Sequence, residues 1–465
     1  MTHKVLLEKF LLFEDENNLF DIRVEDIPIW EYTRFDIFHL LKNELVAVHH
    51  SVGIKKMSKF KRAFKNYVWN TLFKNPFQID KNVELLVFNH SRRREVDSFY
   101  QDIHTDPFLP HLKMDYAVIE SVFNWGHLKP AKTSNLYYFD AIELPGAFKR
   151  ILSSKEPTQG DLEKIDKILS LIEERWGEIH LAYTKMTIIR LIRQYKSTYL
   201  RVEKLLRKKN PRAILSVVSY AFNNQIVTEV AHKLNIKVIE VQHGIAGPLH
   251  IGYNFLGNPS LKTLPDYFLA WGDYWIKNTR MAIPKENIKI VGYPYLDNFR
   301  QKTKVERNEK QLVFLSQMSG EVGRFAEELA TLLPDHKIIF KAHPTEYTVV
   351  FEKYTYLKNK SNVEIIATDN KPLYEIFQES NFVFGVNSTA MIEALGFCNT
   401  IFVLKFAGWE YFEDMADNES FVFISSVEEA VTQIKSGKRF RSTLNLDQFF
   451  ARDATAKTCK FLETF

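Results

Sequence analysis

The chain has 465 residues, of which 45% are hydrophobic and 26% charged, and its formal net charge is +5 at pH 7. This length exceeds one ordinary compact core and predicts two or three domains. The mild positive charge does not by itself indicate nucleic-acid binding. Two cysteines, Cys398 and Cys459, argue against both a disulfide framework and a cysteine metal site.

Membrane and export signals are not found in the sequence. No apolar run reaches the ~18–20 residues that span a bilayer, and the first residues do not resemble a signal peptide. We therefore expect a cytoplasmic protein, with peripheral contact at the inner face of the plasma membrane as an option.

The first 80 residues contain one unusual segment, Lys55–Phe77. It places Phe60, Phe64, Val68 and Leu72 on one helical face among many lysines. A basic amphipathic helix of this kind can lie on an anionic membrane surface. A helix that docks on its own domain with a solvated basic face is an equally good interpretation.

From about residue 83, short apolar runs alternate with amphipathic stretches, which is typical of parallel strands connected by helices. The first series of predicted strands is Val83–Phe88, Tyr116–Glu120, Ala213–Val218, Lys237–Val241, Tyr267–Trp271 and Ile288–Val291. The second series is Leu312–Ser316, Lys337–Lys341, Val363–Ile366, Phe382–Val386, Thr400–Leu404 and Phe421–Ile424.

The polar, highly charged segment Arg300–Gln311 separates the two series and is the best candidate for a linker. The predicted fold class is therefore α/β, with two Rossmann-like, doubly wound parallel sheets that face a cleft. We expect a first domain over residues 1–300, including an N-terminal helical extension, and a second domain over 301–445. Residues 446–465 are expected to form a C-terminal helix that can pack back on the first domain.

Open parallel sheets bind ligands at the carboxyl ends of their strands, so the residues that follow each strand matter most. His243 and Gly244 follow one strand of the first series, and an imidazole there can act as a general base or, when protonated, bind an anion. We expect Gly244 to adopt a backbone conformation denied to other residues and so to leave His243 at the cleft edge. A turn histidine satisfied by a carbonyl is the alternative.

In the second series, His343 and Pro344 follow a strand, and Pro344 holds His343 in an extended conformation. Further on, Ser388 and Thr389 begin a helix, with Asn387 or Ser388 as its N-cap and Glu393 about one turn inside. We expect a donor phosphate between His343 and this helix start, and ribose hydroxyls at Glu393. Ordinary turns and capping are the alternatives.

Two further elements border the expected cleft. Gly292-Tyr293-Pro294 precedes the linker and forms a hinge turn or a cleft wall. Arg92, Arg93 and Arg94 follow the first strand of the first domain and suit an anionic acceptor, although a solvated loop is nearly as good an interpretation.

The order of these elements resembles that in GT-B glycosyltransferases of bacterial capsule and teichoic-acid assembly, over roughly residues 210–440. These enzymes include transferases that use CMP-activated sialic acid or Kdo, and glycerophosphate polymerases. The resemblance implies that His343 and Pro344, with Ser388 and Thr389, bind the donor nucleotide, and that His243 is catalytic. Glu393 stands where the polymerases favour aspartate, and the first element is Gln242-His243-Gly244-Ile245 rather than their Trp-His-Gly-Thr. Both departures favour a sugar nucleotide over a polyol phosphate.

The expected function is therefore transfer of a sugar from a nucleotide donor, with CMP-sugar favoured, to a glycan or lipid-linked acceptor. Neither HxH, HExxH nor Asp-x-Asp spacing occurs, so we expect no metal and no cofactor. The alternatives are polyol-phosphate transfer, sugar-nucleotide 2-epimerisation and a non-catalytic capsule subunit. For an epimerase, we find no convincing match to the first-domain carboxylates that it needs. Nucleic acid is not an expected partner.

Overall fold

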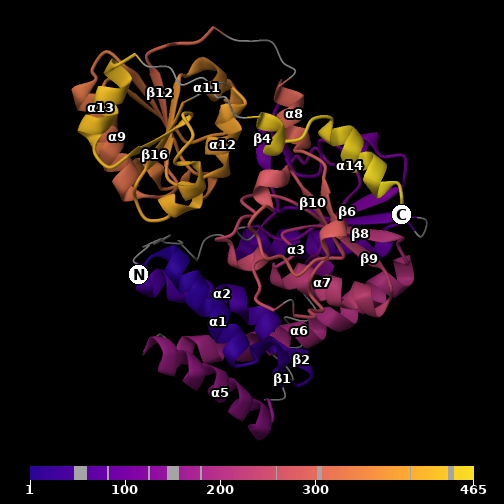
Figure 1. Cartoon of the computed structure of the whole chain (residues 1–465). Helices are drawn as coiled ribbons and strands as arrows, with labels where there is room; N and C mark the ends of the chain where they lie inside the picture. Colours follow the sequence, from indigo (N-terminus) through magenta and orange to yellow (C-terminus); the bar gives the residue numbers. More distant parts are fainter. Residues whose placement is uncertain are drawn as a thin grey trace.

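Two parallel sheets form the framework of the protein, whose structure is a computed structural model (Figure 1). The structure describes residues 1–46, 60–80, 83–123, 126–143, 157–177, 181–257, 259–300, 306–397, 400–437 and 445–465. All strands predicted in both series occur within one or two residues of the expected bounds. The α/β prediction with two doubly wound sheets is confirmed.

The first sheet has the strand order β11-β10-β9-β8-β3-β6-β7, and all its pairs are parallel. Its strands, in chain order, are β3 (Leu85–Phe88), β6 (Tyr116–Glu120), β7 (Leu136–Tyr138), β8 (Ala213–Val217), β9 (Lys237–Val241), β10 (Tyr267–Ala270) and β11 (Ile288–Ile290). The chain winds outward from β3 to β7 and then returns beside β3 as β8. The topological switch point of this sheet therefore lies between β3 and β8.

The second sheet has the order β14-β13-β12-β15-β16-β17 and is also parallel throughout. Its strands are β12 (Gln311–Leu315), β13 (Lys337–Lys341), β14 (Val363–Ile366), β15 (Phe382–Gly385), β16 (Thr400–Leu404) and β17 (Phe421–Ile424). The switch point lies between β12 and β15. Nearly every residue of β12, β13, β15 and β16 is buried, as expected for strands covered on both faces.

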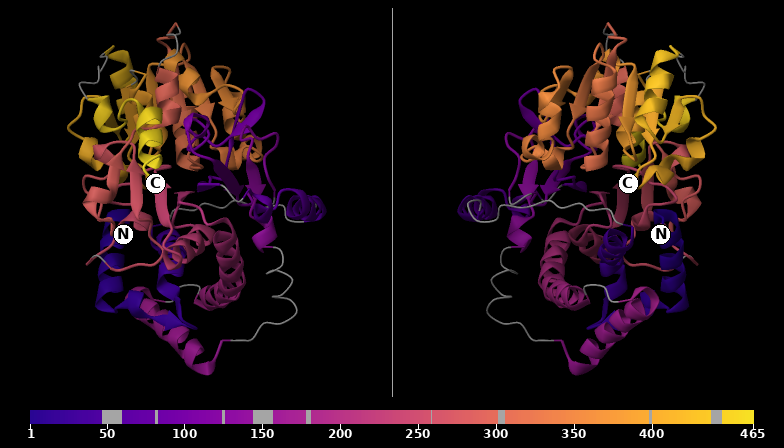
Figure 2. Two further views of the ribbon diagram at one scale, coloured as in Figure 1. Left: turned by 90° about the vertical axis from the view of Figure 1, so that its right-hand side faces the viewer. Right: turned by 90° about the vertical axis from the view of Figure 1, so that its left-hand side faces the viewer.

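Helices cover both sheets. In the first part of the chain they are α1 (His3–Glu16), α2 (Ile29–Leu45), α3 (Phe60–Phe73), α5 (Gln159–Trp176), α6 (Leu181–Lys209), α7 (Phe222–Lys233) and α8 (Pro294–Arg300). In the second part they are α9 (Gly320–Leu332), α10 (Val350–Lys353), α11 (Leu373–Glu379), α12 (Thr389–Leu395), α13 (Val427–Lys435) and α14 (Ala454–Leu462). Helices α1, α2, α5 and α6 form a lobe below the first sheet (Figures 1 and 2).

Two short antiparallel pairs complete the described fold. Strands β1 (Arg23–Val24) and β2 (Ile27–Pro28) lie in the N-terminal lobe. Strands β4 (Arg94–Val96) and β5 (Phe99–Gln101) form a hairpin after β3, with Asp97 and Ser98 at positive φ in its turn. This hairpin carries part of the cleft wall.

The C-terminal segment lies against the first domain, beside β10 in Figure 1. The Trp275 indole donates to the Phe449 carbonyl at 2.7 Å, and the Ala451 amide donates to the Trp271 carbonyl at 2.8 Å. Cys459 and Leu462 of α14 belong to the same apolar core as β3, β6 and β8. The chain therefore crosses from the first domain to the second and back again.

A continuous apolar cluster spans the two domains near these crossings. It joins Phe268 and Trp271 of the first domain to Val313 and Ile401 of the second, and it includes Phe450. The crossing residues 301–305, in the predicted linker, lie outside the described residues.

Candidate functional site

A cleft lies between the two domains at the carboxyl ends of both sheets. Its lining draws on the residues after β3, β9, β10 and β11 in the first domain and after β12, β13 and β15 in the second. Both switch points therefore open into it, as expected for ligand sites in doubly wound sheets. Every candidate site residue from the sequence lines this cleft: Arg92, Arg93, Arg94, His243, His343, Pro344, Ser388, Thr389 and Glu393.

His343 follows β13 and begins the short helical turn Pro344–Glu346. Its backbone is extended, as Pro344 requires, and its Nδ1 accepts a hydrogen bond from the Thr345 amide at 3.3 Å. The Glu346 carboxylate accepts from the His343 amide at 3.0 Å, which completes a capping box. Nδ1 also lies 2.7 Å from the Thr345 hydroxyl, and where it accepts from both groups the proton of a neutral ring is on Nε2.

Ser388 is the N-cap of α12, and its Oγ accepts from the Ala390 amide at 3.3 Å. The predicted capping role of this position is therefore present. Because α12 has only seven residues, side chains rather than the helix dipole must supply most of any ligand binding here.

Glu393 lies one turn into α12 and is only 4% exposed. Burial raises the pKa of its carboxyl, while Arg94 and the Tyr374 and Thr389 hydroxyls act in the opposite direction. Tyr374 donates a hydrogen bond to Oε2. A ribose hydroxyl would therefore share this carboxylate with Tyr374.

Lys341, at the end of β13 and two residues before His343, also lines the cleft, although the sequence gave it no role. Its ammonium group donates to the Tyr347 hydroxyl at 2.8 Å and lies 3.5 Å from the Asp369 carboxylate. Burial lowers its pKa to about 8, with Asp369 acting in the opposite direction. It adds a cation to the second-domain side of the cleft.

His243 lies after β9, where its two ring nitrogens face two tyrosines. Its Nε2 lies 3.1 Å from the Tyr220 hydroxyl, and its Nδ1 lies 3.5 Å from the Tyr253 hydroxyl. Burial lowers the pKa of His243 well below its usual range, and His90, His250 and Arg92 add to this effect. The imidazole is therefore neutral at physiological pH, which favours a base over a resting cation.

The expectation about Gly244 is wrong. Its φ lies outside the left-handed range, and a Cβ built there would meet nothing within 4 Å. The position of His243 is set instead by the end of β9 and by its contacts with the two tyrosines.

Glu240, the carboxylate of β9, lies behind Tyr253. The Tyr253 hydroxyl donates to its Oε1 at 2.8 Å, and the Ser219 hydroxyl donates to its Oε2 at 2.5 Å. Burial raises the pKa of Glu240 to about 7, although these hydrogen bonds favour the ionised form. Tyr253 thus links a buried carboxylate to the cleft histidine.

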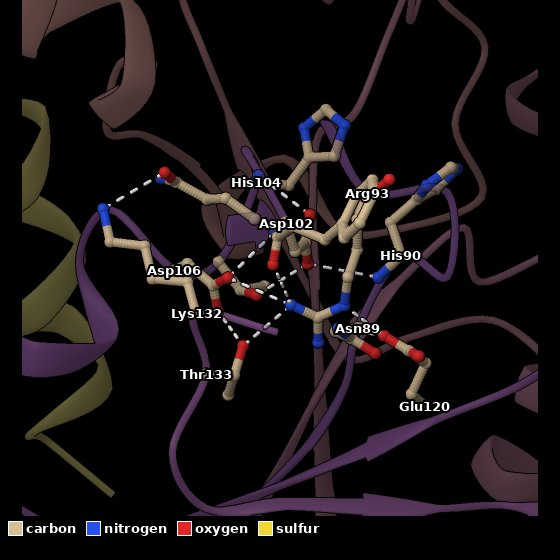
Figure 3. Close-up of polar contacts among 12 residues, drawn as sticks. Asn89, His90, Arg93, Asp102, His104, Asp106, Glu120, Lys132 and Thr133 are labelled. Atoms are coloured by element: carbon tan, nitrogen blue, oxygen red, sulfur yellow. Dashed lines mark hydrogen bonds and ion pairs between the residues drawn. The ribbon is translucent and has the colours of Figure 1, made fainter. Parts of the chain in front are cut away.

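The three consecutive arginines have different environments. The Arg93 side chain is fully buried and donates to Glu120, to Asp106 at 3.2 Å and to Thr133 at 2.9 Å (Figure 3). This guanidinium holds the hairpin base against β6, which leaves it unsuited to the acceptor role expected from the sequence. Arg94, on β4, is electrostatically coupled to Glu393 across the cleft.

Two more histidines line the cleft: His90, which begins the segment ending in the three arginines and was given no role from the sequence, and His104, which the sequence did not mark. His90 and His104 lie with ring centroids 5.6 Å apart, and each ring centroid is 6.1 Å from that of His243. Burial lowers the pKa of His90 to about 4, and the pKa of His104 falls well below its usual range for the same reason. The Nδ1 of His104 has no hydrogen-bond partner among the described residues. Since His104 precedes no glycine and ends no strand, no sequence signal marked it.

In the described part of the chain, no group of three or more His, Cys, Asp or Glu side chains is arranged to hold a metal ion. Within the same residues, no helix combines the length and apolarity needed to cross a membrane.

Comparison with known families bears on the second domain. Residues 314–404 match the family model described as alpha-2,8-polysialyltransferase (POLYST). The matched segment runs from β12 to the end of β16 and contains His343, Ser388, Thr389 and Glu393. Over these residues the chain is similar to a family of glycosyltransferases. No curated protein sequence matches it significantly.

Several solved structures resemble the overall arrangement. UDP-GlcNAc 2-epimerase from Methanocaldococcus jannaschii is 12% identical, with 82% of this chain and 99% of that chain covered and a TM-score of 0.48. The enzyme from Neisseria meningitidis, bound to UDP-GlcNAc, is 13% identical with the same coverage and TM-score. MurG from Acinetobacter baumannii is 9% identical, covers 82% of this chain and 99% of its own, and has a TM-score of 0.45. Likeness at this level carries no inference about the reaction.

Proposed function

We propose that this chain is a glycosyltransferase that transfers a sugar from a CMP-activated donor to a growing surface glycan or a lipid-linked acceptor. The observation that carries the proposal is the gathering of His243 from the first domain and His343, Ser388 and Thr389 from the second around one cleft. The family matched by residues 314–404 is named for polysialyl transfer. The resemblance found in the sequence is to transferases that use CMP-activated sialic acid or Kdo.

The donor nucleotide is assigned to the second-domain side. The His343 Nε2–H, the Ser388 and Thr389 hydroxyls and the Lys341 ammonium are donors suited to a phosphate. Glu393 is the acceptor for ribose hydroxyls. These groups would stabilise the leaving nucleotide without a metal, so activity is expected to survive chelation with EDTA.

His243 is proposed as the general base. Its neutral ring can accept a proton at Nε2, where the Tyr220 hydroxyl now lies at 3.1 Å. An acceptor hydroxyl that replaces Tyr220 at this nitrogen would be activated for attack on the donor sugar. Arg92 and Arg94, with the unpartnered Nδ1 of His104, are proposed to hold the acceptor. Arg93 is assigned to positioning the hairpin.

The test is a thermal-shift screen against CMP, CDP, UDP, GDP and dTDP. A ligand that binds only the folded state at a hundredfold excess over its dissociation constant raises stability by about 2.7 kcal/mol. We expect the largest rise with CMP. We expect His343→Ala to weaken CMP binding by about 1.5–3 kcal/mol, because it removes a charge-assisted hydrogen bond. A largest rise with another nucleotide would contradict the CMP assignment.

Nucleotide sugars supplied without acceptor separate the alternative functions. Slow hydrolysis supports transfer, whereas epimerisation of the sugar at C2 would support a 2-epimerase. Absence of binding to every nucleotide would support a non-catalytic subunit.

A further inference from the structure

Between Tyr67 and Phe73, where its side chains are described, helix α3 buries a polar residue and exposes apolar ones. Asn70 is 1% exposed and donates to the Asp140 carboxylate at 2.9 Å. The Lys74 carbonyl, just after the helix, accepts from the Tyr138 amide at 2.9 Å. These contacts fix the helix to the edge strand β7 through polar groups.

The opposite side of α3 is apolar and uncovered. Val68, Trp69, Leu72 and Phe73 are 37%, 59%, 58% and 56% exposed. Their spacing places them on one face of the helix, and the Trp69 and Phe73 rings lie 4.2 Å apart. Single exposed apolar side chains need no explanation, but four on one helix form a patch that indicates a binding surface.

Figure 2 shows α3 as the purple helix that stands out at the side of the first domain. The exposed residues of the patch therefore lie on a projecting element. In the expected segment Lys55–Phe77, residues 55–59 lie outside the described residues, whereas the predicted helix is present from Phe60.

Charge decides which partner fits. The sequence from Phe60 to Ile79 contains Lys61, Arg62, Lys65 and Lys74 and no Asp or Glu. Each lysine or arginine near an anionic bilayer contributes about 1 kcal/mol of attraction, and a tryptophan is favoured at the lipid headgroup level. A second copy of this chain would instead bring like charges together.

We propose that the face formed by Val68, Trp69, Leu72 and Phe73 docks on an anionic lipid surface. The apolar side chains enter the boundary between headgroups and acyl chains, and the net positive charge of this segment of the sequence adds attraction to the headgroup phosphates. Docking of this kind does not depend on which sugar is transferred.

Sedimentation with vesicles tests the proposal. Phosphatidylcholine vesicles with ~30 mol% phosphatidylglycerol are expected to bind the full chain, and vesicles of phosphatidylcholine alone to bind it less. The variant Trp69→Ser/Leu72→Ser/Phe73→Ser is expected to lose at least ~10-fold in vesicle affinity, because it removes the buried apolar area. The matched control is Met186→Ser/Leu200→Ser on α6, whose side chains are 70% and 64% exposed, and it is expected to bind like the unmodified chain.

The substituted side chains are exposed, so the melting temperature and the slow hydrolysis of donor without vesicles should not change. The single variant Trp69→Lys provides a second, milder test of the same face. Equal vesicle binding by the triple variant and the unmodified chain would overturn the proposal. So would a dimer in light scattering that the triple variant abolishes while vesicles bind neither protein.

Discussion

His243 lies between two tyrosines. The directions of the hydrogen bonds around it determine which of its ring nitrogens carries the proton. The Gly252 amide donates to Nδ1 of His250 at 3.1 Å, so the proton of His250 is on Nε2, 3.4 Å from the Tyr220 hydroxyl. Tyr220 can then direct its own proton to Nε2 of His243. The lone pair of that nitrogen then points to a site occupied by a proton donor. A general base requires this arrangement.

We predict that His243→Ala lowers turnover by ~10²–10⁴-fold and leaves donor affinity nearly unchanged, because a base acts only in the chemical step. Steady-state kinetics with a fixed acceptor, together with CMP binding by calorimetry, measure the two quantities. A parallel loss of CMP affinity would instead assign His243 to the donor phosphate. Near-normal turnover would exclude both roles.

Glu240 gives a pH dependence of stability. Its carboxyl titrates near 4.5 in the unfolded chain and near 7 in the folded protein, because burial penalises the charge. Between these values the folded state retains a proton that the unfolded state has released, so the contribution of Glu240 to stability falls as pH rises. Above about pH 7 the loss is constant, at most about 3 kcal/mol.

The variant Glu240→Gln cannot ionise, so its unfolding free energy should fall less over this pH interval than that of the unmodified chain. Urea unfolding at a series of pH values measures the difference. Parallel curves for the two proteins would show that Glu240 does not titrate there.

The sequence predicted the cleft residues that follow strands, since the end of a strand can be recognised from its apolar run. His243, His343, Ser388 and Glu393 were found in this way. Tyr220, Tyr253 and His104 were not, because they meet His243 only through the packing of loops that are distant in the sequence. The sequence did not predict the burial of Arg93 for the same reason. Its partners Asp106 and Glu120 come close to it only when the chain folds.

At the scale of elements, the long apolar strands were predictable and the short ones were not. Strand β7 has three residues at an edge, and the β4–β5 hairpin has three residues in each strand, of which Phe99 is 48% exposed. Such segments carry too few buried residues for a periodic pattern. Their positions depend on the sheet that they join.

Gly292 follows β11 and packs directly against the C-terminal segment. Among the described glycines, it is the one where an added Cβ would come closest to another atom. Its φ is +91°, and a Cβ there would lie 2.1 Å from the Ala451 carbonyl oxygen and 2.8 Å from the Ala454 Cβ. Because both the backbone conformation and the space exclude a side chain, we predict that Gly292→Ala lowers the unfolding free energy by more than about 1 kcal/mol.

Chemical denaturation measures this effect, with Gly160→Ala as the control. Gly160 lies near the start of α5, and a Cβ there would meet nothing within 4 Å. The control should be neutral or stabilised by up to about 1 kcal/mol. An equal response of the two variants would contradict the close packing at Gly292.

For the whole molecule, the proposed donor and acceptor groups lie on opposite walls of the cleft, which predicts closure of the cleft when both substrates bind. The apolar cluster around Trp271, Val313 and Phe450 continues from one domain into the other, at the points where the chain passes between them. It can therefore serve as the hinge. We predict a smaller radius of gyration in solution scattering when a non-hydrolysable donor analogue and acceptor are both saturating, because closure excludes water from the activated sugar. Superimposable curves with and without the ligands would count against closure.

The return of the C-terminus to the first domain has a consequence for synthesis of the protein. During translation, domains generally fold as units, with the N-terminal one first. Here Cys459 and Leu462 belong to the core of the first domain, and Phe449 accepts the hydrogen bond of Trp275. The first domain emerges from the ribosome early, but it cannot complete its packing until Phe449 and α14 have been released. It must therefore wait through synthesis of the whole second domain with part of its core open, and the second domain can reach its native packing before the first.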